Sequence, residues 1–144
     1  MGIRKFKEED IDSVMSIWLR ATVAAHPFIS EFYWRCNYNT VKKEYIPKSE
    51  TYIYEENKSI KGFISIIEGN YIGALFIEPS SQNRGIGKRL LEYVKGNYES
   101  LTLSVYKDNK KAYNFYEKAS FKAVKEMKNT SRGFLEVLMK LESE

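Results

Sequence analysis

The sequence has one cysteine, one histidine and three prolines among its 144 residues. Because Cys36 is alone, no disulfide can form within the chain, and we expect a cytoplasmic protein. His26 is alone too, so a zinc site of the usual Cys/His type is excluded and we expect no metal. The longest apolar run, 71–77, is much shorter than the roughly 20 residues of a membrane-spanning helix. The first five residues begin no apolar signal segment, so we expect no membrane association.

The chain also lacks a dense run of basic residues. Lys and Arg number 23 against 19 Asp and Glu, which gives a formal net charge of +4. So small a charge suits a protein that binds an acidic small molecule, and it argues against nucleic acid. The length and the hydrophobic fraction of 43% predict a single domain over residues 1–144, present as a monomer or homodimer.

Hydrophobic periodicity predicts an α/β fold, a mixed sheet with helices on both faces. Helical spacing predicts helices from a cap at Asp10 to before Pro27, from a cap at Ser30 to Pro47, after Gly85, and over 112–119. β-branched and aromatic runs predict strands over 2–6, 51–54, 60–67, 71–77, 101–105, 121–127 and 134–141. The predicted order is therefore β-α-α-β-β-β-α-β-α-β-β.

The junction between the strand at 71–77 and the following helix carries the strongest functional signal. A polar loop follows Pro79, and Gly85 and Gly87 then open the helix. Glycines let a ligand approach the backbone, and the unpaired N–H groups of a helix N-terminus attract anions. The junction predicts a phosphate or diphosphate site, to which three basic side chains add charge: Arg84, Lys88 and Arg89. A strand–turn–helix with capping glycines and a solvated basic turn is the alternative.

Two motifs lie in order on these elements, Gln82-x-x-Gly85-x-Gly87 and then Asn109-x-x-Ala112-x-x-Phe115-Tyr116. They resemble motifs A and B of the GNAT superfamily, the GCN5-related N-acetyltransferases, whose order of elements is also the predicted one. The segment 25–29 and Tyr33-Trp34 resemble small single-domain bacterial members that acetylate peptidyl lysine. One position departs from motif B, because its glycine is Ser120 here. A left-handed residue is usual at that helix end, so we expect the turn to be built differently.

The resemblance implies an N-acetyltransferase fold and an enzyme that moves an acetyl group from acetyl-CoA to a primary amine. It implies that the strand edge at Leu75, Phe76 and Ile77 pairs with the pantetheine arm, where a backbone N–H polarises the thioester carbonyl. It implies that Asn109 and Ala112 also contact this arm. Tyr116 corresponds to the general acid, and an ordinary core tyrosine is the alternative. The implied diphosphate site is the loop and first helical turn: Gln82, Asn83, Arg84, Gly85, Ile86, Gly87 and Lys88.

The amine side of the reaction stays open at this stage. Histone-type relatives use a Glu as base where this chain has Tyr71, which we interpret as a positioning residue and proton relay. Glu68 through a water, His26, or no dedicated base are the alternatives. An aromatic wall for a lysine or peptide acceptor is predicted from Phe28, Tyr33 and Trp34, and packing between helices is the alternative. His26 is a further candidate for substrate binding. A protein lysine or N-terminus is the favoured acceptor; a small-molecule amine and a non-catalytic CoA-binding regulatory module are the alternatives.

Overall fold

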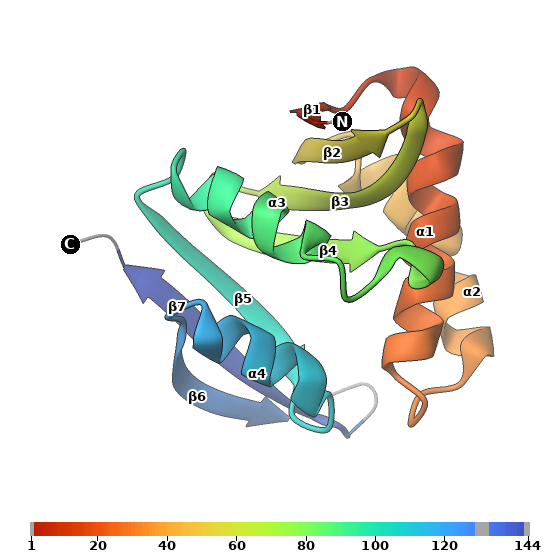
Figure 1. The fold of residues 1–144 in the computed structure, drawn as a ribbon. Helices are drawn as coiled ribbons and strands as arrows, with labels where there is room; N and C mark the ends of the chain where they lie inside the picture. Colours follow the sequence, from red (N-terminus) through yellow and green to blue (C-terminus); the bar gives the residue numbers. More distant parts are fainter. Residues whose placement is uncertain (1, 129–132, 143–144) are drawn as a thin grey trace.

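The computed structural model describes residues 2–128 and 133–142 of the chain. Within these residues it forms a seven-stranded mixed sheet in the order β1-β2-β3-β4-β5-β7-β6 (Figure 1). The strands are β1 (Gly2–Lys5), β2 (Glu50–Glu56), β3 (Ser59–Ile67), β4 (Tyr71–Ile77), β5 (Ser100–Tyr106), β6 (Lys122–Lys128) and β7 (Leu135–Glu142). The helices are α1 (Ile11–Ala25), α2 (Glu31–Thr40), α3 (Ile86–Lys95) and α4 (Lys110–Lys118). Apart from short 3-10 and π turns, the elements follow one another in the predicted order.

The helices cover both faces of the sheet, as predicted. Side chains alternate between the faces along a strand, so Ile53 and Phe63 pack against α1 while their neighbours Tyr52 and Ile64 pack on the α3 side. Figure 1 shows α1 and α2 on one side and α3 and α4 on the other. No helix in the described part of the chain is long and apolar enough to cross a membrane.

The two predicted helix caps have different outcomes. The Oγ of Ser30 accepts a hydrogen bond from the N–H of Tyr33, so Ser30 caps α2 as predicted. Asp10 stands before α1, but its carboxylate accepts from the guanidinium of Arg4 and from the N–H of Lys7. The prediction of a side-chain cap at Asp10 is therefore wrong, because a forked charged donor outcompetes a single helix N–H. The contact with Arg4 also lowers the pKa of Asp10.

The end of α4 keeps the left-handed conformation that glycine usually supplies. Ser120 has a φ of +80°. Its N–H donates to the carbonyl oxygen of Glu117, the N–H of Phe121 donates to that of Tyr116, and both distances are 3.0 Å. This is the hydrogen-bond pattern of a Schellman motif, and the ring of Phe121 completes it by packing 5.5 Å from that of Tyr116. The expectation of a differently built turn is therefore wrong.

Candidate active site

The strands β4 and β5 separate almost as soon as they meet. β4 pairs along its length with β3, but its register with β5 is confined to Tyr71 opposite Thr102. A bulge in β4 at Gly73 interrupts the register with β3 immediately after this point. Bulges bend a strand and end pairing. The rest of β4 therefore presents an unpaired edge towards β5, and a groove opens between the two strands where the resemblance implies pairing with the pantetheine arm.

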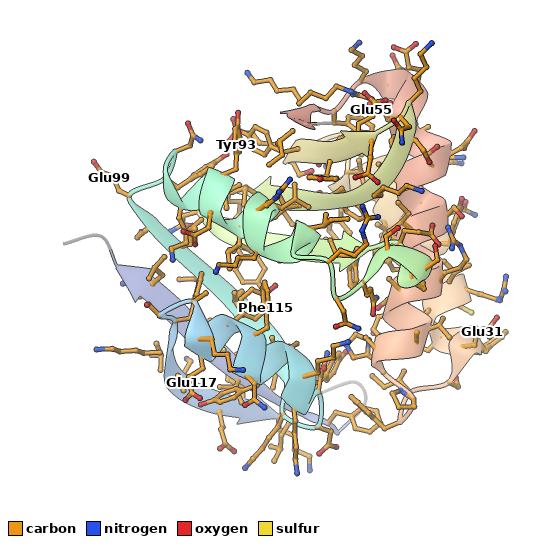
Figure 2. The ribbon with its side chains drawn as sticks, viewed as in Figure 1. Glu31, Glu55, Tyr93, Glu99, Phe115 and Glu117 are labelled. Carbon is orange, nitrogen blue, oxygen red and sulfur yellow. The ribbon has the colours of Figure 1, made fainter. Side chains whose placement is uncertain are left out.

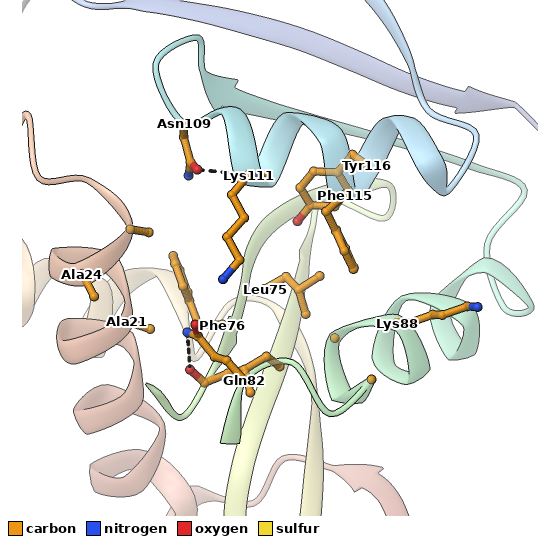
Figure 3. Close-up of a pocket in the computed structure, with 15 residues that line it drawn as sticks. Ala21, Ala24, Leu75, Phe76, Gln82, Lys88, Asn109, Lys111, Phe115 and Tyr116 are labelled. Atoms are coloured by element: carbon orange, nitrogen blue, oxygen red, sulfur yellow. Dashed lines mark hydrogen bonds between the residues drawn. The ribbon is translucent and has the colours of Figure 1, made fainter. Parts of the chain in front are cut away.

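A cavity of about 410 Å³ lies beside this edge (Figure 3). It is bounded by the end of β4, the loop that follows, and the starts of α3 and α4. Three small residues of α1, Ala21, Ala24 and Ala25, form another wall and leave the space open. Nine of the residues predicted to bind the cofactor line it: Leu75, Phe76, Ile77, Gln82, Gly85, Gly87, Lys88, Asn109 and Ala112.

Three residues predicted for the same role do not line this cavity. Ile86 is buried in the core between α3 and the sheet. Asn83 lies in the loop with a left-handed φ of +65°. Arg84 makes an ion pair with Glu56, with both contacts at 2.9 Å. The pair directs the guanidinium of Arg84 towards Glu56, so part of the positive charge that was expected at the anion site faces a carboxylate.

The loop after β4 is shaped by its own hydrogen bonds and by one glycine. The side-chain amide of Gln82 donates to the carbonyl oxygen of Ile77 at 3.3 Å, which ties the loop to the end of the strand. Gly85 has a φ of +83° directly before α3, a conformation that glycine adopts without cost. No side chain caps α3. The first N–H groups of this ten-residue helix therefore remain available to an anion at the edge of the cavity.

A lysine that we did not assign to the site also lines the cavity. Figure 3 shows Lys111 reaching from the start of α4 towards Leu75, Phe76 and Gln82. Lys111 lies four positions before Phe115, which lines the same cavity. Residues with this spacing share one face of a helix. The side chain of Phe115 itself points from α4 towards α3 in Figure 2.

A second cavity, of about 250 Å³, continues from the first between β4, β5 and the ends of α1 and α2. The two share five lining residues: Leu75, Phe76, Asn109, Ala112 and Tyr116. Tyr116 is 8% exposed and lies where the cavities meet. Burial, helped by the charge of nearby Tyr71, raises the pKa of Tyr116 well above its ordinary value. The hydroxyl of Tyr116 therefore keeps its proton at neutral pH.

His26 connects α1 to α4 across the groove. Its Nδ1 lies 2.7 Å from the carbonyl oxygen of Thr22, which can only accept, so Nδ1 carries the proton. Its Nε2 then accepts from the amide of Asn109 at 3.3 Å. The Oδ1 of Asn109 is engaged too, because it accepts from the N–H of Ala112 and caps α4. Burial lowers the pKa of His26, which favours the neutral ring that this arrangement needs.

The rings predicted for the acceptor side lie together, but two of them, Phe28 and Tyr33, line neither the first nor the second cavity. His26 and Trp34 line the second cavity, and their rings are 5.2 Å apart. Phe28 does not line it; its ring packs between those of His26, Tyr106 and Phe134. Tyr33 packs against Trp34 at 5.0 Å.

The two other residues considered for the amine side lie elsewhere. Tyr71 lines a third cavity, of about 290 Å³, on the α1 side of the sheet. It shares three lining residues with the second cavity: Trp18, Gly73 and Ala74. Glu68 is an exposed turn residue between β3 and β4 with a φ of +55°. Among the described residues, no three Asp, Glu, His or Cys side chains gather closely enough to hold a metal ion.

Comparison with known families defines the class of protein. The family described as "Acetyltransferase (GNAT) domain" matches residues 5–143, so the chain belongs to the GNAT acetyltransferases. It is similar to the peptidyl-lysine N-acetyltransferase YiaC of Escherichia coli K12, at 36% identity over 122 residues that cover 85% of this chain and 84% of the relative. It is also similar to the peptidyl-lysine N-acetyltransferase YjaB of Salmonella typhimurium, at 29% identity over 85% of this chain and 83% of the relative.

Solved structures share the fold. The solution structure of apo-form YjaB from Escherichia coli has a TM-score of 0.84 at 25% identity, and the match covers 99% of this chain and 98% of that one. The PaiA N-acetyltransferase of Thermoplasma acidophilum, crystallised with coenzyme A, has a TM-score of 0.80 at 19% identity over 98% of both chains. The predicted family, mixed α/β fold and enzyme class are confirmed: the protein is an N-acetyltransferase that uses acetyl-CoA and an amine acceptor.

Proposed function

We propose that the protein transfers the acetyl group of acetyl-CoA to the side-chain amine of a lysine in another protein. The observation that carries the proposal is the meeting of two cavities at Tyr116, one suited to a long thioester and the other to an amine. The names of the two relatives support a peptidyl-lysine acceptor. We further propose that residues 1–144 act as one domain in the cytoplasm, which the single cysteine supports.

The first cavity fits the cosubstrate. Acetyl-CoA is a long chain that ends in phosphates, and the cavity runs from the start of α3 along the unpaired edge of β4. In our proposal the backbone of Leu75, Phe76 and Ile77 pairs with the amides of the pantetheine arm. The N–H groups at the start of α3 hold the diphosphate. Ala112 leaves room for the arm where the two cavities meet.

Tyr116 is the proposed general acid. When the amine has attacked the thioester, the C–S bond breaks and the sulfur leaves as a thiolate that needs a proton. Tyr116 lines both cavities where they meet, and its hydroxyl carries a proton at neutral pH. Positioned proton donors of this kind typically contribute 10²- to 10⁴-fold to a rate.

The second cavity is the proposed acceptor site. None of the described residues around it is acidic, and five of them carry large aromatic rings: Trp18, Trp34, Phe76, Tyr106 and Tyr116. An apolar stem with one amine, such as a lysine side chain, suits these walls better than a polyamine, whose several charges call for carboxylates. The Nε2 lone pair of His26 is occupied by Asn109. We therefore assign His26 a positioning role and not that of a base.

The test is CoA release from acetyl-CoA, followed by thiol detection with lysine peptides, N-terminal peptides, polyamines and aminoglycosides as acceptors. We expect turnover with lysine peptides and a loss of about 10²-fold or more in kcat for Tyr116→Phe. Tyr113→Phe is the matched control, since Tyr113 belongs to the same helix and lines neither of the two cavities. Equal losses in both variants would contradict the general acid. Tight binding of acetyl-CoA without turnover on any acceptor would contradict the proposed reaction.

A further inference from the structure

Two adjacent lysines, Lys110 and Lys111, begin α4, and their side chains lie on different sides of the helix. Lys111 lines the cavity proposed for acetyl-CoA. Lys110 lines a separate hollow between α4 and β6, together with Lys107 and Glu126. The two residues have the same side chain and charge, and both belong to the first turn of α4, so the helix dipole acts on them almost equally. They differ in whether they face the cavity.

The charge of Lys111 is not neutralised by the protein. Of the described residues that line the cavity, none is acidic. Within the described part of the chain Lys111 makes no ion pair, whereas Lys107 binds Glu126 and Lys95 binds Glu92. Lys111 is an exposed residue, so its ammonium group lies hydrated at the rim of the cavity, where its positive charge attracts an anion that enters.

Lys111 also faces the anion site predicted at the start of α3. Figure 3 shows its side chain directed across the cavity towards Gln82, whose loop leads to Gly85 and Gly87. Of the basic residues nearer to that loop, Arg84 binds Glu56 and Arg89 donates to the hydroxyl of Tyr54. Lys88 also lines the cavity, but its side chain points away from Gln82 and Lys111 in Figure 3. An anion at the start of α3 would therefore meet N–H groups on one side and the ammonium of Lys111 on the other.

We propose that Lys111 binds the diphosphate of acetyl-CoA and completes a two-sided clamp with the N-terminus of α3. This assignment rests on the proposed use of the first cavity by acetyl-CoA. The bond is a charge-assisted contact from Nζ to a phosphate oxygen. Its function is to hold the nucleotide half of the cosubstrate against α3 while the pantetheine arm lies along β4.

The test compares Lys111→Gln, Lys111→Arg and Lys110→Gln by calorimetric titration with three thioesters. Acetyl-CoA has the diphosphate and the 3′-phosphate, acetyl-dephospho-CoA has only the diphosphate, and S-acetylpantetheine has neither. For Lys111→Gln we expect Kd to rise about tenfold or more for the first two, since a hydrogen bond to a charged group is lost, and to stay unchanged for S-acetylpantetheine. Lys111→Arg restores much of the affinity, and Lys110→Gln binds all three as the parent does.

Several results would overturn the assignment. An unchanged Kd for acetyl-CoA in Lys111→Gln would do so, as would an equal loss for S-acetylpantetheine, which points to a contact with the arm. A loss confined to acetyl-CoA would move the contact to the 3′-phosphate. If the parent protein itself fails to bind acetyl-CoA, the proposed function fails together with the clamp, whereas parent binding with an unaffected Lys111→Gln removes the clamp alone.

Discussion

Replacing Ser120 by glycine should stabilise the protein. Ser120 has a left-handed backbone conformation, which glycine adopts at a lower free-energy cost than serine does. At φ +80° an L side chain crowds the following carbonyl oxygen, at a cost of about 1–2 kcal/mol. Glycine removes that cost but loses about 0.4–1 kcal/mol more on folding, through the greater freedom of the unfolded chain. In the described part of the chain the Ser120 side chain makes no hydrogen bond, and both backbone bonds of the turn can form with glycine. The balance is a gain of about 0.8 kcal/mol.

Thermal and urea unfolding measure this gain. For a domain of this length we expect Tm to rise by about 2–3 °C, with an unchanged urea m value and unchanged acetyl transfer. Lys118→Gly in the last turn of the same helix is the control, because glycine inside a helix should lower stability by about 1 kcal/mol. Ser120→Ala should lie close to the parent, since alanine has the same left-handed cost. A Ser120→Gly variant that is less stable than the parent would refute the reasoning.

Two further predictions concern pH and the core. The pKa of His26 is lowered in the fold, so between that pKa and about 6.5 the unfolded chain binds the proton more readily. Stability should therefore fall as the pH drops below about 6.5, by at most about 1.4 kcal/mol per pH unit for this group. Thermal melts at stepped pH should show a shallower fall in His26→Gln, and equal slopes would contradict this, because the carboxylates with lowered pKa are common to both proteins. Leu90 lies on the buried face of α3 and is 0% exposed. Leu90→Ala should therefore lower the free energy of unfolding, measured in urea, by about 2–5 kcal/mol. Leu135→Ala, at a residue that is 43% exposed, should change stability by less than about 0.5 kcal/mol, and a similar cost for both would contradict the assigned core.

The parts of the site that depend on local backbone could be predicted from the sequence. A strand that ends at a proline, followed by a loop with Gly85 before an apolar helical face, specifies a strand–turn–helix whatever surrounds it. The same holds for Asn109, whose side chain caps α4 three residues ahead of Ala112. These features depend on neighbours within a few positions, and residue types encode such neighbours directly.

The parts that depend on distant partners could not. Arg84 has the charge expected of a phosphate ligand, but Glu56, 28 positions away, binds it. His26 contacts Asn109 across 83 positions, and no local pattern indicates that pairing. Asp10 has the residue type of a helix cap, and a strand residue, Arg4, takes its carboxylate instead. In each case the residue type allows more than one hydrogen-bond or ion-pair partner, and the tertiary fold determines which partner lies within reach.

The single register pair between β4 and β5 divides the sheet into two parts that are each continuous in sequence. On one side of the division, antiparallel ladders connect β1, β2, β3 and β4 in that order. On the other side, they connect β5, β7 and β6 in that order. Beyond Tyr71 and Thr102 the two parts share an apolar core, to which Ile72 of β4 and Leu103 of β5 both belong. Apolar contacts have no preferred direction. A small shift of the two parts relative to each other would therefore break no ladder of hydrogen bonds. The separation of β4 and β5 can adjust, whereas strands that pair along their whole length stay at one spacing.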